Sequence, residues 1–552
     1  MKPDVIGFSC YIWNIEMILN IVSVLKKILP NVKIILGGPE VSYDYNHLFQ
    51  KNVDLVIIGE GEKTTYEVIS YFNGKINSLS DIDGIAYIEN NNIITTPPRK
   101  PLDLDEIPFV YDDYSLDELQ NKIIYYEASR GCPYRCQYCL SSVEQGVRFL
   151  SKERVFSDLK FFLDNNVRQV KFVDRTFNCN KKLAIDIWEY LIENDNNVTN
   201  FHFEVSADII DEDMFSVLKK ARKQLFQLEI GVQSTNLDTL SAIQRKTDLK
   251  ELFEKVLKIK SFGNIHQHLD LIAGLPFEDY KSFSHSFDDV YSVYPEQLQL
   301  GFLKLLRGSG LRKDSEKYGI VYNEKAPYEV LYTEKVSFEE MMLLKYIEEM
   351  VETYYNSGKC LNTVKYVIKH FERPFVFFEK LALYWVSKKY HEVSHNKMKL
   401  YTIMFEFCSL HIKDIEKLKD ILKFDMFLND NVKNFPNWLE QNSVEENKDG
   451  ERFELSNDLL SHRTHSAGGS GTDAAAVGCG IDLWGVYRAV SGGYGGPRGH
   501  GRGAEPAEAP AVHAVCPRRL CCCGAGLAAD VSLWRDSLCV VRRYSVLCGR
   551  FF

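Results

Sequence analysis

Apolar residues in the first 75 positions occur either in short unbroken runs or at helical spacing. Residues 5–10, 32–38 and 55–59 are apolar runs of the kind found in strands that are buried on both faces of a sheet. Residues 14–29 and 62–72 repeat apolar side chains every three or four positions, which predicts amphipathic helices. Because strands that alternate with helices form right-handed βαβ units, residues 1–75 are predicted to form a small Rossmann-like (flavodoxin-like) domain.

The next segment is more polar and is interpreted as a linker over residues 76–121. Residues 85–96 place two apolar runs on either side of an Asn-rich turn, which predicts a hairpin. Pro97 and Pro98 end this hairpin, and residues 102–108 are expected to be an extended connector.

Repeated strand and helix patterns resume after residue 121. Helical patterns, such as residues 152–165 and 181–193, lie between successive apolar runs. Six strand–helix units predict a partial TIM-type (βα)6 barrel over residues 122–310 that is open on one side. The six predicted strands are residues 122–129, 169–174, 200–206, 225–232, 267–273 and 296–304.

The remaining chain has two parts of different composition. Residues 311–460 have helical patterns at 337–356, 361–371 and 375–389, and predict a mainly α-helical domain with an aromatic core. After Leu460 lysine and asparagine disappear, whereas glycine, alanine, arginine and cysteine become common. Residues 461–552 are therefore interpreted as an atypical tail, disordered or foreign to the rest of the chain. The fold class is α/β, with a helical C-terminal domain.

Composition narrows the function classes. The formal net charge of the 552 residues is -10, which argues against a surface that coats nucleic acid. No apolar run approaches the roughly 18 residues of a membrane span, and no secretory signal precedes the first strand. Cysteines are few before the tail, which fits a reducing, cytoplasmic environment.

Three cysteines stand together in one short loop after the first barrel strand. Cys132, Cys136 and Cys139 have Cys-x3-Cys-x2-Cys spacing, and Gly131 and Pro133 permit a tight turn beside them. Thiolates are soft ligands that select zinc, Cu(I) or an iron–sulfur cluster. Structural zinc usually needs four protein ligands, and no second cysteine pair is nearby. The loop therefore favours a [4Fe–4S] cluster with one open iron; a zinc site with a distant fourth ligand and three unrelated thiols are the alternatives.

This cysteine motif resembles that of the radical S-adenosylmethionine (radical SAM) enzymes. The resemblance implies that three irons are held by Cys132, Cys136 and Cys139, and that the open iron binds SAM through its amino and carboxylate groups. It also implies reductive cleavage of SAM to methionine and a 5′-deoxyadenosyl radical. Tyr138 matches the aromatic position that packs near the adenine of SAM.

The first domain resembles the cobalamin-binding domain that precedes many radical SAM barrels. The similarity lies in the opening strand, in Leu-Gly-Gly-Pro-Glu up to Glu40 and in Gly-Glu-Gly-Glu up to Glu62. It implies that Gly37, Gly38, Gly59 and Glu60 border the nucleotide tail of the cofactor. Two departures argue against bound cobalamin: only three of about five family strands are expected, which leaves a sheet edge bare, and none of the thirteen histidines lies in an Asp-x-His-x-x-Gly loop.

Polar residues follow the predicted barrel strands, where the chemistry of such barrels gathers. The family resemblance carries functions to several of them. Asp174 and Arg175 match the region near the SAM amino group, and Arg245 is a further candidate for its carboxylate. The positions that match residues near the SAM ribose or carboxylate are Glu204, Ser206, Gln233 and Ser234. The stretch from Asp270 to Pro276 resembles the part of the oxygen-independent coproporphyrinogen oxidase branch that borders the adenine.

The sequence therefore predicts a radical SAM enzyme with a [4Fe–4S] cluster and SAM, acting on a small molecule or peptide. With cobalamin the expected reaction is methyl transfer; without it, rearrangement, ring formation or dehydrogenation. An electron donor such as flavodoxin or ferredoxin is the expected partner, with no nucleic acid and no membrane. A non-catalytic iron–sulfur or corrinoid-binding protein and a zinc-binding scaffold remain as alternatives.

Overall fold

The computed structural model describes residues 3–111, 122–143, 146–430, 436–439, 538–542 and 545–548. These described residues belong to one compact unit. Most of the predicted tail, residues 461–552, lies outside the described ranges. No helix among the described ranges is both long enough and apolar enough to cross a bilayer.

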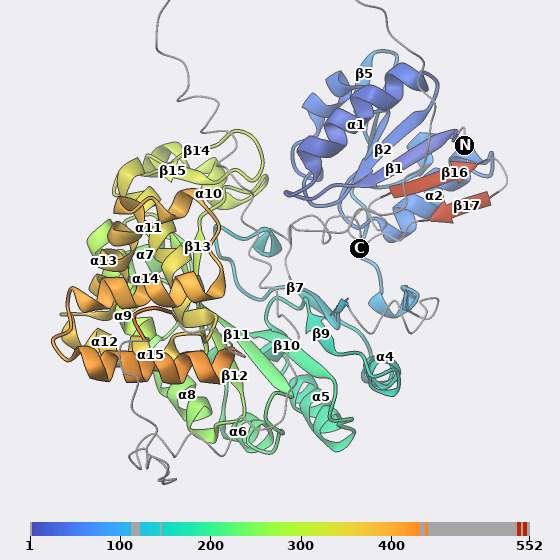
Figure 1. Ribbon diagram of the computed structural model, residues 1–552. Helices are drawn as coiled ribbons and strands as arrows, with labels where there is room; N and C mark the ends of the chain where they lie inside the picture. The colour runs from blue at the N-terminus through green and yellow to red at the C-terminus, as the bar shows by residue number, and fades with distance from the viewer. Residues whose placement is uncertain are drawn as a thin grey trace, which may run out of the picture. The chain divides into compact units, whose positions relative to one another are not determined.

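The three predicted N-terminal strands and their helices are present (Figure 1). Strands β1 (Val5–Ser9), β2 (Lys33–Gly37) and β3 (Leu55–Ile57) are parallel. Helices α1 (Ile15–Ile28) and α2 (Glu62–Phe72) connect and follow them, as their periodicity predicts.

The hairpin assigned to the linker belongs instead to this sheet. Strand β4 (Ile85–Glu89) pairs antiparallel with β3, and β5 (Asn92–Thr95) pairs with β4. Ile85 and Tyr87 are buried in one core cluster with Val68 of α2, so burial of these side chains holds the hairpin on the sheet. The N-terminal sheet therefore has five strands from this region rather than three.

The edge of β1 that was expected to be bare is paired. Strand β16 (Leu538–Arg542) lies antiparallel to β1, and β17 (Ser545–Cys548) pairs with β16. The sheet order is β17-β16-β1-β2-β3-β4-β5. These two short strands are the described part of the tail, and they satisfy backbone groups that an open edge would expose.

The six predicted barrel strands all form, and they pair in parallel in the order β13-β12-β11-β10-β9-β6. They are β6 (Ile123–Tyr126), β9 (Gln169–Phe172), β10 (Asn200–Val205), β11 (Phe226–Gln233), β12 (His266–Ala273) and β13 (Gln297–Phe302). The connecting helices are α4 (Lys152–Asp164), α5 (Lys181–Glu193), α6 (Glu212–Leu218), α7 (Leu237–Ala242), α8 (Leu249–Phe262) and α9 (Tyr280–Ser292).

The helical C-terminal region follows a short hairpin, β14 (Val321–Tyr322) and β15 (Val330–Tyr332). Its helices lie together in Figure 1 and share one core with the barrel. They are α11 (Phe338–Val351), α12 (Leu361–Val367), α13 (Pro374–Ser387), α14 (Lys397–Ser409) and α15 (Ile415–Asn429), with a π-helical turn at Glu352–Asn356 after α11. The short helix α10 (Gly310–Lys313) precedes the hairpin. Most of the aromatic residues of this region are buried in or packed against this core, as expected, whereas Tyr332 and Phe427 are exposed.

The π-helical turn covers the open edge of the barrel sheet. Leu298 on edge strand β13 donates its N–H to Asn356 Oδ1 at 2.9 Å, and its carbonyl accepts from Asn356 Nδ2 at 2.9 Å. One side-chain amide therefore replaces the neighbouring strand that β13 lacks. Tyr355 adds a hydrogen bond to the carbonyl of Pro295.

We expect Asn356→Ala to destabilise the protein by about 2 kcal/mol, because it leaves two backbone groups of β13 without their partner. The measurement is the midpoint of thermal unfolding followed by circular dichroism. Asn194→Ala, which removes an exposed hydrogen bond to Tyr190, is the matched control and should change the midpoint little. Equal shifts for the two variants would contradict this role for Asn356.

Candidate functional site

The cysteine loop leaves the barrel through a small antiparallel ribbon that the sequence patterns did not indicate. Strands β7 (Ser129–Gly131) and β8 (Val147–Phe149) pair at the two ends of the loop. Gly131 has φ +105°, and a Cβ there would collide with the carbonyl oxygen of Gly146. Glycine at 131 is therefore required both for the backbone conformation and for the close approach of the two ends.

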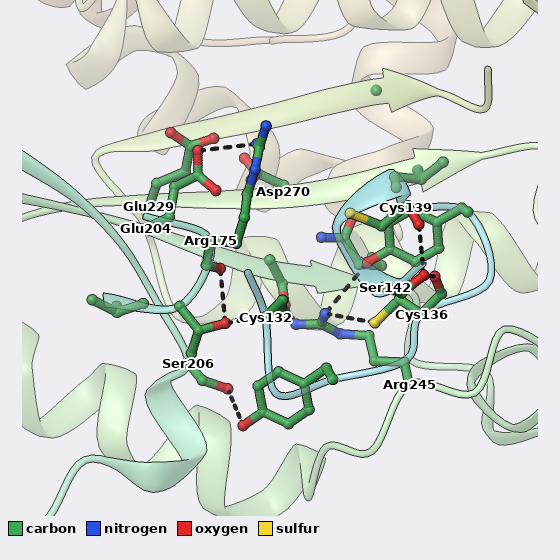
Figure 2. A pocket seen from close by; sticks show the side chains of 18 of the residues that line it. Cys132, Cys136, Cys139, Ser142, Arg175, Glu204, Ser206, Glu229, Arg245 and Asp270 are labelled. Carbon is green, nitrogen blue, oxygen red and sulfur yellow. Dashed lines mark hydrogen bonds and ion pairs between the residues drawn. The ribbon is translucent and has the colours of Figure 1, made fainter. Parts of the chain in front are cut away.

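All three cysteines of the loop line one cavity of about 340 Å³ (Figure 2). Cys136 is buried, whereas Cys132 and Cys139 are half-buried. Among the residues that the structure describes, no three His, Cys, Asp or Glu side chains gather closely enough to hold a single metal ion. A cluster of several irons needs thiolates that are spread around it, each bound to a different iron.

Arg245 lies beside the most buried cysteine. Its guanidinium is 3.9 Å from Cys136 Sγ and donates to Tyr138 Oη at 3.3 Å and to the carbonyl of Gly231. Burial raises the pKa of the Cys136 thiol, and the charge of Arg245 opposes this shift. The candidate carboxylate-binding arginine thus contacts the cysteine loop, and its charge favours the thiolate form that a metal site needs.

Five of the predicted SAM-contacting residues line the same cavity as the cysteines: Tyr138, Arg175, Glu204, Ser206 and Gln233. They come from the cysteine loop and from the carboxyl ends of β9, β10 and β11. Burial raises the pKa of Glu204 to about 7, and Arg175, 3.9 Å away, opposes this shift. Ser206 accepts a hydrogen bond from Tyr134 and donates one to Asp208.

The other two predicted barrel residues do not line the cavity. Asp174 accepts hydrogen bonds from the N–H of Ala128 at 3.0 Å and the hydroxyl of Ser129 at 2.5 Å. It therefore ties the end of β9 to the segment that enters the cysteine loop. Ser234 is fully buried and donates to Glu278 Oε1 at 2.7 Å, which is a contact within the barrel wall.

The N-terminal candidates lie at the carboxyl ends of β2 and β3. Gly38 has φ +102° and packs against the backbone of Cys10, whereas Gly59 has φ +75° and leaves open space where a Cβ would project. Gly37 ends β2. Glu60 is engaged by Arg130 and Arg148 of the β7–β8 ribbon.

Sequence reasoning predicted Glu204 and Asp270 on the inner face of the barrel but missed Glu229. Glu229 lies opposite Glu204 on the neighbouring strand and binds His202 Nε2 at 2.7 Å and Lys171 Nζ at 3.0 Å. Burial alone would raise the pKa of Glu229, but His202 and Lys171 together lower it. The signal was available, because Phe226-Gln-Leu-Glu-Ile-Gly-Val-Gln233 alternates apolar and polar residues, which predicts one polar face.

A second acid on this face is Asp270. Burial raises its pKa, although His268 Nε2 lies 3.1 Å from its carboxylate and opposes the shift. Figure 2 places Glu204, Glu229 and Asp270 on the side of the cavity away from Cys136 and Cys139. The cavity therefore combines Cys136 and Cys139 at one end with carboxylates and Arg175 at the other, which suits a ligand that carries both charges.

Three family models match the chain, one after another. Residues 1–69 match the B12 binding domain, residues 126–290 match the radical SAM superfamily and residues 316–464 match a protein family of unknown function, DUF4080. The first match supports cobalamin binding, against the expectation drawn from the missing histidine loop.

Two curated relatives are described as methyltransferases. The cobalamin-dependent radical SAM methyltransferase TokK of Streptomyces tokunonensis is 25% identical over 350 residues, which cover 58% of this chain and 50% of TokK. The uncharacterized methyltransferase PH0819 of Pyrococcus horikoshii is 28% identical over 288 residues, or 50% of this chain and 61% of that protein. The chain thus spans about half the length of the curated relatives it matches.

A solved structure has the same fold over most of the chain. The cobalamin-dependent SAM radical enzyme OxsB, with aqua-cobalamin and SAM bound, superposes with a TM-score of 0.53 at 16% identity. The alignment covers 77% of this chain and 73% of OxsB.

The buried carboxyl of Asp174 gives a pH dependence to stability. Burial raises its pKa to about 7 in the folded protein, although Ser129 and Ala128 oppose the shift. Below the pKa that Asp174 has in the unfolded chain, its protonated carboxyl contributes fully to the stability of the folded protein. This contribution is lost as the pH rises through the pKa of Asp174 in the folded protein. We expect thermal unfolding midpoints of the wild type to fall between pH 5 and pH 7.5 by more than those of Asp174→Asn. Parallel pH profiles would contradict this assignment.

Proposed function

We propose that the chain is a cobalamin-dependent radical SAM methyltransferase, because residues 126–290 match the radical SAM superfamily and residues 1–69 match the B12 binding domain. The observation that carries the proposal is the cavity in which three thiols face carboxylates and an arginine. The proposed reaction is methyl transfer to a carbon of a small molecule or peptide, and it would consume two molecules of SAM. One would be cleaved to methionine and a 5′-deoxyadenosyl radical that takes the hydrogen atom from this carbon and leaves as 5′-deoxyadenosine. The other would give its methyl group, with cobalamin as the carrier, and leave as S-adenosylhomocysteine, while the proposed electron donor supplies the electrons.

In this proposal Cys132, Cys136 and Cys139 each hold one iron of a [4Fe–4S] cluster, and the fourth iron is left for SAM. When bound and reduced, the cluster supplies the electron that splits SAM into methionine and a 5′-deoxyadenosyl radical. The protein contributes binding, orientation and exclusion of water, since the cofactors supply the difficult chemistry.

The charged side chains of the cavity are complementary to the charged groups of SAM. The amino group and the sulfonium of SAM are cationic, and Glu204 and Asp270 offer carboxylates on one side of the cavity. The carboxylate of SAM requires a cation, and Arg245 is the candidate for this role that lines the cavity. Gln233 adds an amide whose Oε1 has no hydrogen-bond partner among the described residues, so it is available to a ligand hydroxyl or N–H.

Methyl transfer is favoured by the named functions of the relatives. Besides TokK, the 2-(S-pantetheinyl)-carbapenam-3-carboxylate methyltransferase of Streptantibioticus cattleyicolor is 26% identical over 307 residues. For the present chain, the reaction type, a flavodoxin or ferredoxin as electron donor and a cytoplasmic location are part of the proposal. The domain bounds given above and the individual roles of the cavity residues are also part of the proposal.

Anaerobic reconstitution with iron and sulfide tests the proposal. We expect an iron–sulfur absorption band that SAM perturbs, and 5′-deoxyadenosine after addition of dithionite. Cys136→Ala should abolish the cluster, because three thiolates are needed to hold three irons. Cys360→Ala, at a buried cysteine of the helical region, is the control and should retain it. A cluster without SAM cleavage would favour a non-catalytic iron–sulfur protein, and bound zinc without iron would favour a zinc scaffold.

Arg245 allows a test of the cluster environment that does not require turnover. Because its positive charge lies beside Cys136, Arg245→Gln should lower the reduction potential of the cluster by roughly 50 mV. Arg222→Gln removes an arginine that pairs with Asp195 outside the cavity, and it should leave the potential unchanged. A redox titration followed by electron paramagnetic resonance gives both values, and equal potentials in wild type and Arg245→Gln would contradict the assignment.

A further inference from the structure

The two strands at the base of the cysteine loop place two arginines side by side. In the β7–β8 ribbon Arg130 is the direct partner of Arg148, and Gly131 is the partner of Val147. Like charges that lie directly opposite on paired strands are destabilising. Since Arg130 stands two residues before Cys132, this repulsion acts at the point where the chain enters the candidate cluster site.

One carboxylate of the N-terminal domain is bound by both arginines. Arg130 Nη1 lies 3.1 Å from Glu60 Oε1, and Arg148 donates to the same carboxylate. The N–H of Leu102 donates to Glu60 Oε2 at 2.9 Å, and only 12% of the Glu60 side chain is exposed. Burial alone would raise the pKa of Glu60, but Arg148, Leu102 and Arg130 lower it, so the carboxylate is held in its charged form.

Two further carboxylates, those of Glu62 and Glu127, also pair with Arg130. Arg130 Nη2 binds Glu62 at 2.8 Å and Glu127 at 2.7 Å, while Arg148 also donates to the carbonyl of Leu102 at 2.5 Å. Glu60 nevertheless differs from the other acids, because it is the carboxylate that contacts both members of the arginine pair. Charge-assisted hydrogen bonds of this kind are about twice as strong as neutral ones.

We infer that Glu60 is a positioning residue for the cysteine loop. Its carboxylate joins Arg130 to Arg148, and so fixes the two ends of the loop that carries Cys132, Cys136 and Cys139. The turn after β3, which the family resemblance assigns to the nucleotide tail of cobalamin, thus has a second task in this chain. The inference deepens the proposed function, because it makes the cluster loop depend on the N-terminal domain.

A second contact of the N-terminal domain reaches the last barrel strand. Glu40, in the turn after β2, accepts from Arg307 Nε at 3.1 Å and from the hydroxyl of Tyr328. Arg307 follows β13 and also binds Asp44. The turns after β2 and β3 therefore contact the segments that follow the last and the first barrel strands, respectively.

The test uses the full-length protein without cofactors. In Glu60→Gln, amide hydrogen exchange of residues 129–131 and 147–149 should be about tenfold faster than in the wild type, because the arginine pair loses its shared anion. Glu67→Gln, which breaks the ion pair with Arg99 inside the N-terminal domain, is the matched control and should leave these amides unchanged.

Two outcomes would overturn the inference. One is unchanged exchange of the loop base in Glu60→Gln; the other is loss of cobalamin affinity without faster exchange, which would mean that Glu60 serves the cofactor instead. Arg148→Gln provides a second route if Glu60→Gln does not fold. It should also speed exchange, and combined with Glu60→Gln it should add little, whereas additive effects would contradict a shared contact. A wild-type protein that binds no iron would contradict the proposed function. It would not change the interpretation of the exchange results.

Discussion

Six parallel strands do not close into a barrel here, and the two edge strands of this open sheet must find hydrogen-bond partners elsewhere in the chain. On one edge, Asn356 binds both backbone groups of Leu298. On the other, Tyr111 donates to the carbonyl of Tyr125 at 2.6 Å. The N-terminal turns contact the segments after these same edge strands, at Arg130 and Arg307. The helical region therefore supplies hydrogen bonds to one open edge of the sheet. The N-terminal domain contacts the segments that follow both edge strands.

The open sheet also explains why its inner face is polar. In a closed eight-stranded barrel, layers of branched apolar side chains fill the interior. In this protein the inner positions of β10, β11 and β12 carry Glu204, Glu229, His268 and Asp270 instead. Buried charges of this kind are tolerated when they are paired, as Glu229 is with His202 and Lys171. Glu204 has the weakest pairing among these carboxylates, and this makes it the most suitable for a ligand.

Local signals in the sequence predicted the strands, the helices and the three cysteines, because each depends on residues close together in the chain. The cysteine loop is one example, since its spacing alone indicates a shared metal cofactor. Features that depend on distant residues were missed. Glu60 and Arg148 are 88 positions apart, and nothing near either residue indicates their contact. The hairpin β4–β5 was recognised, but its pairing with β3 depends on burial of Ile85 and Tyr87 against α2, which local patterns do not report.

Gly308 has a consequence for how such chains can diverge. It has φ +90°, and a Cβ there would collide with the ring of Tyr43 in the N-terminal domain. Any side chain at this position would have to displace an aromatic residue 265 positions earlier, so substitutions at the two sites cannot be accepted independently. An exchange of the N-terminal domain for that of a distant relative would succeed only where the incoming domain leaves the same narrow space. The fit of this domain to this barrel thus constrains positions 43 and 308 together.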